Sequence, residues 1–362
     1  MRAAVFHGRG DVRVEDVPMP VPREGELLLK VAAVGICGTD AHEFSTGPHM
    51  FPIDHSHPVS GHVGPMIPGH EIAGIVVGTG SDVTDFSEGM LVVSGAGISC
   101  GTCHWCQRGR TNLCRSYSTL GLHQHGGLAE FVAVPASTCI DAGPFGVTSD
   151  TAALAQPMSI AVHAMRRGRL EKDDTAVIIG AGGIGAFLTY AAAQTGATVL
   201  VSDIDQSRLD IAGALGANYL FRPHGDQTIE AVLTAEELIP TVIFEVSGSP
   251  GGLAESLAIA PRGCRIVMVG LQSNPVDMDV RRVSLTEIEL IGTNAHVKGT
   301  DLGEALRLLS SRDAGWEDIA PEAISLDELV SDGLIPLSER RSTRIKTLID
   351  PWTTEKRKTR MF

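Results

Sequence analysis

An uncharged stretch from Thr175 to Ser202 constrains the fold of this chain more than any other feature of its sequence. Its centre reads IIGAGGIGAF, and a segment so rich in glycine would make a poor membrane-spanning helix. Apolar runs on both sides of a glycine-rich turn are typical of a buried strand followed by a tight turn and a helix. The stretch therefore predicts the first strand–turn–helix unit of a parallel sheet.

The same alternation of apolar runs and helical segments continues along the chain. Near-continuous apolar runs, as in strands covered on both faces, occupy residues 175–180, 198–203, 241–246, 264–270 and 288–293. Helical patterns lie between them, for example at 183–197 and 205–217. We expect residues 157–295 to form a doubly wound parallel sheet of the Rossmann type.

The rest of the chain, residues 1–156 and 296–362, has a different pattern. Short runs rich in β-branched residues predict strands of an irregular, mostly antiparallel barrel at 26–37, 71–80, 89–96 and 128–137. The fold class is therefore α/β, with the Rossmann sheet inserted in a β-rich domain. The basic run at residues 355–360 is expected to be a solvated tail.

The overall charge excludes some classes of partner. The 362 residues carry a formal net charge of −14. Nucleic acids and anionic membranes would therefore be repelled. The N-terminal residues lack the apolar core of a signal peptide. We expect a cytoplasmic protein that acts on small molecules and keeps its thiols reduced.

Four of the seven cysteines are crowded into one short loop, at Cys100, Cys103, Cys106 and Cys114. Thiolates at these spacings can fill the tetrahedral coordination of one zinc ion, which leaves no open position for substrate. We interpret the loop as a structural zinc site without catalytic chemistry. A chance cluster of buried cysteines and a redox or iron–sulfur role are the alternatives.

The glycine-rich turn has the pattern of a dinucleotide site. Asp203 ends the second apolar run, where its carboxylate would accept hydrogen bonds from the adenosine ribose and repel a 2′-phosphate, which favours NAD over NADP. We expect Arg208 to lie along the adenine or to face water; turned towards the ribose, it would weaken this preference. The residues expected to contact the cofactor are Gly180, Gly182, Gly183, Ile184, Gly185, Asp203, Arg208, Val269, Gly270 and Leu271.

Two short segments of the β-rich part carry metal-binding side chains. The segment GICGTDAH contains Cys37 and Asp40, and PGHE contains His70 and Glu71. Together with the four-cysteine loop and the GAGGIG turn, in this order, they resemble the zinc-dependent medium-chain dehydrogenase/reductase family over nearly the whole chain. The resemblance implies a GroES-like catalytic domain, with a catalytic zinc between it and the Rossmann domain. It implies Cys37 and His70 as ligands, Glu71 as a third or exchangeable ligand, and Asp40 as the partner of the far nitrogen of His70.

This resemblance agrees with the chemistry that the residues can perform. An incompletely ligated zinc makes an alcohol acidic enough to be oxidised at neutral pH, with NAD as the hydride acceptor. The proton must still leave a dry pocket. The hydroxyl of Thr39 can pass it on, and His42 can hand it to solvent through the cofactor ribose. The family resemblance implies the same two roles.

One position departs from the family pattern. In the polyol and diol dehydrogenases of the family, a glutamate precedes the proline that opens the hinge helix, and its carboxylate lies at the zinc. Here Gln156 precedes that proline. We expect Cys37, His70 and Glu71 still to hold the zinc, which would then be more electrophilic, giving two zinc ions per chain. The alternative is a weakened or lost zinc, and with it a catalytically impaired NAD-binding protein.

The segment between GICGTDAH and PGHE is long and rich in histidine, with His49, His55, His57 and His62. We expect a surface loop near the mouth of the cleft; a second metal site is the alternative. The length of this segment, together with residues 120–135, is most similar to the 2,3-butanediol dehydrogenase branch of the family. Threonine and sorbitol dehydrogenases are similar but more distant. The expected reaction is therefore NAD-linked interconversion of a secondary alcohol and a ketone, with a vicinal diol or polyol as substrate.

A rival class of enzyme is disfavoured by the same motifs. Zinc-free quinone or enone reductases of the same superfamily lack the residues that correspond to Cys37, Thr39 and the cysteine loop.

The apolar runs at 264–271 and 288–296 lie near the edge of the expected Rossmann sheet, where they can pair across a two-fold axis as in relatives. We therefore expect a homodimer or homotetramer.

Overall fold

The computed structural model describes residues 1–225, 227–272 and 274–361. They form two compact units: residues 1–159 together with 296–362 are unit 1, and residues 160–295 are unit 2. Among the helices of the described residues, none is both long and apolar enough to cross a membrane.

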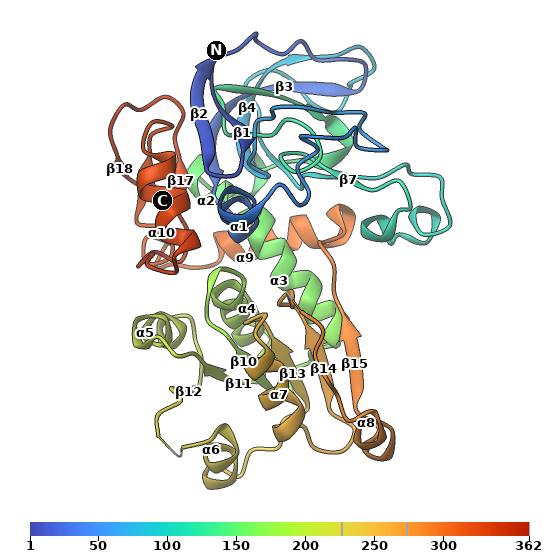
Figure 1. Cartoon of the computed structure of the whole chain (residues 1–362), viewed down its shortest axis with the longest axis vertical. Helices are drawn as coiled ribbons and strands as arrows, with labels where there is room; N and C mark the ends of the chain where they lie inside the picture. The colour runs from blue at the N-terminus through green and yellow to red at the C-terminus, as the bar shows by residue number, and fades with distance from the viewer. Residues whose placement is uncertain (226, 273, 362) are drawn as a thin grey trace. The chain divides into compact units, whose positions relative to one another are not determined.

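Unit 2 is built on a parallel sheet of six strands (Figure 1). Their spatial order is β12 (Tyr219–Phe221), β11 (Thr198–Ser202), β10 (Thr175–Ile179), β13 (Val242–Glu245), β14 (Arg265–Met268) and β15 (Glu289–Gly292). The five expected apolar runs all form strands, and the expected Rossmann fold class is confirmed. The short strand β12 was not predicted, because its alternation leaves Leu220 exposed and gives no apolar run.

The order of these strands defines the place where a nucleotide can bind. The chain moves from β10 to one side through β11 and β12, and then returns to pair β13 with the other side of β10. In doubly wound sheets, ligands bind outside the carboxyl ends of the strands at such a reversal. The helices of this unit are α4 (Gly183–Ala193), α5 (Gln206–Ala214), α6 (Ile229–Ala235), α7 (Pro250–Ile259) and α8 (Val280–Thr286).

Unit 1 is centred on strand β3 (Glu26–Gly35), which pairs with strands from three distant parts of the chain. Its antiparallel neighbours are β4 (Glu71–Thr79), β8 (Phe131–Pro135) and β17 (Leu348–Ile349). The same sheet contains β5 (Leu91–Ser94), β9 (Cys139–Asp141), β16 (Glu322–Ile324) and β18 (Arg357–Lys358), and a separate hairpin joins β1 (Arg2–Gly8) to β2 (Asp11–Asp16). Only β16 and β17 pair in parallel within this described sheet, so the expected mostly antiparallel character is confirmed.

The helices of unit 1 are short. They are α1 (Gly38–Thr46), α2 (Ser149–Ala152), α9 (Gly303–Ser310) and α10 (Ile335–Ser338). Helix α3 (Ala155–Gly168) begins in unit 1 and continues into unit 2.

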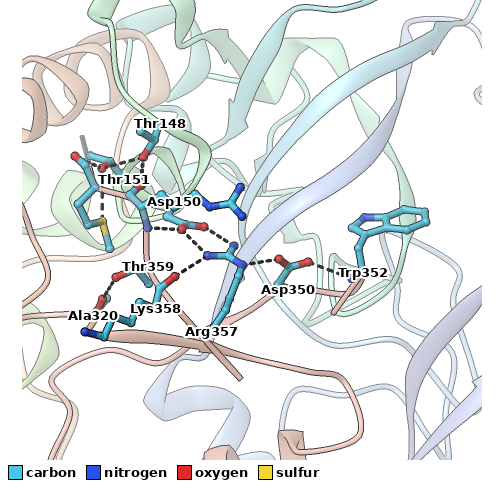
Figure 2. Close-up of polar contacts among 11 residues, drawn as sticks. Thr148, Asp150, Thr151, Ala320, Asp350, Trp352, Arg357, Lys358 and Thr359 are labelled. Carbon is cyan, nitrogen blue, oxygen red and sulfur yellow. Dashed lines mark hydrogen bonds and ion pairs between the residues drawn. The ribbon is translucent and has the colours of Figure 1, made fainter. Parts of the chain in front are cut away.

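The basic C-terminal run does not form the solvated tail that its charge suggested. Arg357 begins strand β18, and its guanidinium lies between two carboxylates, Asp150 and Asp350 (Figure 2). The Asp150 side chain is completely buried and therefore needs a counter-ion, which Arg357 supplies. The tail expectation is therefore wrong for Arg357, whose buried partner Asp150 lies far away in the sequence, while the side chains of Lys356, Lys358 and Arg360 are exposed.

The histidine-rich segment is more than a surface loop. Phe51 and Met66 of this segment are buried in a small apolar cluster with Phe6 and Leu122. Histidine rings also pair across the segment's borders, as in the stacked rings of His57 and His123 at a centroid distance of 4.4 Å. The expectation of a surface loop therefore applies to only part of the segment.

Candidate functional site

The pairing of β3 with β4 brings together the two segments that carry metal-binding side chains, GICGTDAH and PGHE. Gly35 at the end of β3 lies opposite Glu71 at the start of β4. Cys37 follows β3 and caps helix α1, while His70 directly precedes β4. As a result, one ligand atom each from Cys37, His70 and Glu71 lie within 4.8 Å of one another.

The electrostatics of this cluster suit a bound cation. Buried oxygen or nitrogen atoms of three side chains have no hydrogen-bond partner among the described residues: Asp40 Oδ1, His70 Nδ1 and Glu71 Oε2. Burial opposes ionisation of Cys37, but the neighbouring His70 lowers the pKa of its thiol. Burial likewise disfavours the charged form of His70, yet Asp40 and Cys37 raise its pKa to about 9. These shifts favour a thiolate beside a protonated imidazole, so the surrounding side chains stabilise a positive charge at the place where a metal would supply one.

The backbone leaves room for the Glu71 carboxylate. A Cβ atom at Gly35 would lie 2.0 Å from Glu71 Oε2, so only glycine fits opposite Glu71 without displacing the carboxylate. Sulfur, imidazole and carboxylate donors are the ligand types of catalytic zinc sites with an open position. These three residues therefore fit a catalytic zinc.

The expected support of His70 by Asp40 is looser than a hydrogen bond. Asp40 Oδ1 lies 3.8 Å from His70 Nδ1, while Asp40 Oδ2 accepts a hydrogen bond of 2.9 Å from the backbone N–H of Cys37. Asp40 therefore fixes the turn that carries Cys37 and faces His70 across a gap.

Sequence reasoning missed a buried cation in this cluster. Lys346 Nζ forms an ion pair with Glu71 Oε1 and donates a hydrogen bond of 3.1 Å to the carbonyl oxygen of Ile36. Its side chain is only 6% exposed. The available signal was the position of Lys346 between Ile345 and the apolar pair Leu348–Ile349, since a charge that is buried with such neighbours requires a partner.

The two residues expected to move the proton differ in their surroundings. Thr39 Oγ1 lies 3.7 Å from Cys37 Sγ and is therefore next to the candidate zinc ligands. His42 is exposed, and its Nδ1 lies 3.2 Å from the hydroxyl of Thr46. The same hydroxyl lies 2.9 Å from Nε2 of His49, whose ring stacks on His42. The structure therefore places Thr39 at the cluster and His42 in an exposed polar group.

Gln156 lies on the first turn of α3 and is half-buried. Its carbonyl oxygen accepts a hydrogen bond of 2.6 Å from Ser159 Oγ, which stabilises this first turn. Contact between the Gln156 amide and a metal remains a prediction.

The four cysteines of the loop converge as a second cluster. Their sulfur atoms all lie within 4.8 Å of one another, with Cys103 Sγ 3.6 Å from Cys106 Sγ. Backbone N–H groups of Cys106 and Arg115 lower the pKa of Cys103 to about 6. Burial, followed by hydrogen bonds with the sulfurs of Cys103 and Cys114, raises the pKa of Cys106 to about 11. Such crowded thiols fit a tetrahedral zinc ion, which would hold all of them as thiolates.

These two clusters are the groups of converging metal-ligand side chains found among the described residues. The histidine-rich segment does not form a third one there. Its alternative interpretation as a metal site therefore gains no support.

The glycine-rich turn lies between β10 and α4, at the carboxyl end of the central strand. Gly180 has a φ of +105°, and a Cβ at Gly185 would lie 1.9 Å from the carbonyl oxygen of Gly180. The turn can therefore close tightly only with glycine at both positions. Gly182 caps α4 without a side chain, and Gly183 and Ile184 form the first turn of that helix. Its free backbone N–H groups suit a pyrophosphate.

Asp203 is buried at the end of β11, beside this turn. Its Oδ2 accepts a hydrogen bond of 2.6 Å from the backbone N–H of Ala181, and its Oδ1 accepts one of 2.9 Å from Asp205. Arg208 is half-exposed and lies 3.8 Å from Asp205, and its Nη1 is 3.8 Å from the Cβ position of Gly182. The side chain of Arg208 thus lies beside the turn, and its expected place along the adenine stays a prediction.

The loop after β14 lies at the same end of the sheet. The backbone N–H groups of Val269 and Gly270 donate to the carbonyl oxygen of Glu245, at 2.8 and 2.9 Å. Leu271 is 86% exposed, so its apolar side chain is free to cover a ligand. The Glu245 carboxylate, which sequence reasoning did not single out, accepts hydrogen bonds from Ser247 and from the backbone of Gly248.

Comparison with known protein families identifies two domains in this chain. Residues 23–144 match the family described as "Alcohol dehydrogenase GroES-like domain", and residues 183–311 match "Zinc-binding dehydrogenase". The GroES-like and Rossmann-like parts of the fold are thereby both identified.

Several relatives match over most of their length. The chain is 32% identical to (R,R)-butanediol dehydrogenase of Neisseria gonorrhoeae, over 97% of this chain and 99% of that protein. It is 31% identical to sorbitol dehydrogenase of Bacillus subtilis, over 83% and 85% of the two chains. Among solved structures, 2R,3R-butanediol dehydrogenase from Bacillus subtilis superimposes with a TM-score of 0.88 at 26% identity, covering 97% of this chain and 99% of that one.

Proposed function

Because the chain belongs to the zinc-dependent alcohol dehydrogenase family, we propose that it interconverts a vicinal diol and the corresponding hydroxyketone with NAD. In the oxidative direction, the C–H bond of the carbinol carbon breaks and its hydride passes to NAD+. The hydroxyl proton leaves to solvent, and the products are a ketone, NADH and a proton. The observation that carries the proposal is the convergence of Cys37, His70 and Glu71 around unpartnered buried polar atoms.

Residues of unit 1 would bind the catalytic metal and the alcohol. A zinc ion held by Cys37, His70 and Glu71 supplies the Lewis acidity that makes an alcohol hydroxyl acidic, and NAD supplies the hydride acceptor. Thr39, beside the thiolate, would accept the hydroxyl proton and pass it on. His42, which is exposed, would release that proton to solvent.

Residues of unit 2 would bind the cofactor. Gly185 packs closely against Gly180, and this tight turn leaves the backbone N–H groups at the start of α4 accessible to a pyrophosphate. The buried carboxylate of Asp203 favours an adenosine ribose with free hydroxyls, and therefore NAD over NADP. The proximity of Arg208 to the turn offers positive charge to the pyrophosphate.

The substrate class follows from the relatives and from the metal site. Relatives similar over most of the chain act on butanediol and on sorbitol, both with hydroxyls on neighbouring carbons. With glutamine at position 156, a neutral amide would face the alcohol in place of a carboxylate. We also infer two zinc ions per chain and a homodimer or homotetramer assembled along the exposed edge of strand β15.

The experiment is a screen of NAD-linked oxidation over chiral 2,3-butanediols, polyols and 3-hydroxy amino acids. Zinc content is measured on the same preparation. We expect turnover with a vicinal diol, close to two zinc ions per chain, loss of activity with a strong chelator and recovery on adding zinc. NADP should be used much less efficiently than NAD.

Three results would contradict the proposal in different ways. Turnover that persists in chelator would identify a zinc-free reductase. Two zinc ions with turnover on 3-hydroxy amino acids such as threonine alone would change the substrate class and keep the reaction. One zinc ion and no turnover on any alcohol would identify a nucleotide-binding protein that has lost its catalytic metal.

A further inference from the structure

We propose that Lys346 is a positioning residue that shares the Glu71 carboxylate with the catalytic metal and so keeps Glu71 a weak, exchangeable ligand. The inference rests on the proposed function, because it takes Cys37, His70 and Glu71 as the zinc site. It goes further in assigning a role to a residue outside the ligand set.

The two oxygens of Glu71 have different surroundings. Oε1 is paired with the Lys346 ammonium, whereas Oε2 is buried and has no hydrogen-bond partner among the described residues. The carboxylate is thus divided: one oxygen is held by a fixed cation, and the other is available to a second cation. Because a carboxylate between two cations binds each of them less tightly than it would bind one, Lys346 competes with a metal for Glu71.

The strand arrangement holds Lys346 in place. Residue Leu348 of β17 pairs with Gly35 of β3, and Gly35 pairs with Glu71 of β4. The backbone N–H of Ile36 donates to the carbonyl oxygen of Thr347 at 3.0 Å, and the Lys346 ammonium donates back to Ile36. With a side chain that is 6% exposed, Lys346 is fixed on both sides and cannot turn to water.

The charges of the cluster balance only when Lys346 is counted. The Cys37 thiolate and the carboxylates of Asp40 and Glu71 carry three negative charges, and Lys346 carries one positive charge. The remaining charge of minus two is neutralised by one divalent ion bound beside a neutral His70. Without Lys346 the same ion would leave the buried cluster negative, which would hold the metal more tightly and make it a weaker electrophile.

An alternative role for Lys346 predicts the opposite change in zinc affinity when its charge is removed. If Lys346 only oriented Glu71 towards the metal, removing its charge would loosen the carboxylate and weaken zinc binding. If Lys346 competes for Glu71, removing its charge strengthens zinc binding. The direction of the change therefore decides between the two roles.

The test measures the zinc dissociation constant of full-length protein by competition with a chromophoric chelator, for the wild type, Lys346→Met and Lys346→Arg. We expect Lys346→Met to bind the catalytic zinc about tenfold more tightly or better, because the carboxylate loses its competing partner. Lys346→Arg keeps the charge and should stay within about threefold of the wild type. Because Lys346→Met leaves Glu71 unpaired in the metal-free protein, the test also uses Lys346→Gln, which keeps a hydrogen-bond donor without the charge and makes the result independent of the folding of Lys346→Met.

Two controls show whether the change in zinc affinity is confined to the site of Cys37, His70 and Glu71. Zinc in the four-cysteine loop should be released at the same rate in all variants. Arg357→Met breaks another buried ion pair of unit 1, with Asp150, and should lower stability without changing the affinity for the catalytic zinc. Cobalt substitution adds a spectroscopic readout, since a tighter carboxylate ligand in Lys346→Met should alter the intensity of the d–d bands.

Unchanged or weaker zinc binding in both Lys346→Met and Lys346→Gln would overturn the inference, and the proposed function would stand if the wild type binds two zinc ions and oxidises a diol. A wild type with zinc only in the cysteine loop would overturn both. Tighter zinc binding in the uncharged variants would support the inference even before a substrate is identified.

Discussion

Arg357 donates hydrogen bonds to both carboxylate oxygens of Asp150, at 2.7 and 2.8 Å, across 207 positions of the chain (Figure 2). The backbone N–H of Arg360 donates to the same carboxylate at 2.7 Å, and the Thr151 hydroxyl donates to the carbonyl oxygen of Met361. The C-terminal segment is therefore attached to helix α2, which directly precedes the helix that carries Gln156. The Arg357 side chain thus stabilises unit 1, while the side chains of Lys356, Lys358 and Arg360 are exposed.

Replacing Arg357 by methionine should lower the free energy of unfolding by about 3 kcal/mol, because Asp150 would be left as an unpaired buried charge. Urea unfolding monitored by circular dichroism checks this. Arg13→Ala removes an exposed ion pair with Asp11 and should change stability by less than about 1 kcal/mol. Equal effects of the two substitutions would mean that the tail adds no more than a surface contact.

Two glycines of the nucleotide turn should respond differently to alanine. At Gly185 a Cβ would lie 1.9 Å from a backbone oxygen, so Gly185→Ala should distort the turn and destabilise unit 2. At Gly182 the atom found near a Cβ is the flexible end of Arg208, at 3.8 Å, so Gly182→Ala should fold normally. Its methyl group would project from the helix cap, where a pyrophosphate would bind. We therefore expect about tenfold weaker NAD binding.

Calorimetric titration with NAD, together with thermal unfolding, separates these effects. Wild-type NAD affinity in Gly182→Ala would show that the pyrophosphate does not contact this turn.

The parts of the fold predicted from sequence are those that local patterns determine. The strands of unit 2, except β12, are apolar because both faces of their sheet are covered, so each is recognisable alone. In unit 1, strands β16, β17 and β18 have only two or three residues each and exist through pairing with distant strands. No periodicity can show in so short a run.

The candidate site divides in the same way. Cys37, His70 and the four cysteines stand in compact motifs whose residue types have few other uses, and the structure brings each group together. The contacts of Lys346 with Glu71 and of Arg357 with Asp150 join residues 275 and 207 positions apart. A lone basic residue gives no hint of its partner, so these contacts could be found only in the folded chain.

Restoring the family carboxylate should show whether position 156 contacts the metal. Gln156→Glu adds a negative charge, so we expect slower zinc release to chelator and oxidation that becomes efficient only at higher pH, because the metal becomes a weaker electrophile. Zinc release rates and the pH profile of kcat are the measurements. Gln194→Glu, which adds the same charge at an exposed position of unit 2, is the control. A pH profile like that of the wild type would show that residue 156 does not contact the metal.

The stacked pair of His57 and His123 should make the protein sensitive to mild acid. Burial, followed by the neighbouring His57, lowers the pKa of His123 from 6.5 to about 4. The unfolded chain then binds this proton more readily than the folded one. The contribution of neutral His123 to the stability of the folded state is therefore complete above pH 6.5 and is lost as the pH falls towards 4. Protonation would also remove the acceptor at Nδ1, which receives a hydrogen bond of 3.0 Å from the backbone N–H of Thr119.

His123→Asn offers an amide oxygen to the same N–H and cannot be protonated in this range. We expect the urea midpoint of the wild type to fall between pH 6.5 and 4.5 more steeply than that of His123→Asn. His224→Asn, at an exposed position of unit 2, should keep the wild-type slope. Parallel pH dependences for the wild type and His123→Asn would show that acid acts on other groups, and that the histidine pair contributes to packing alone.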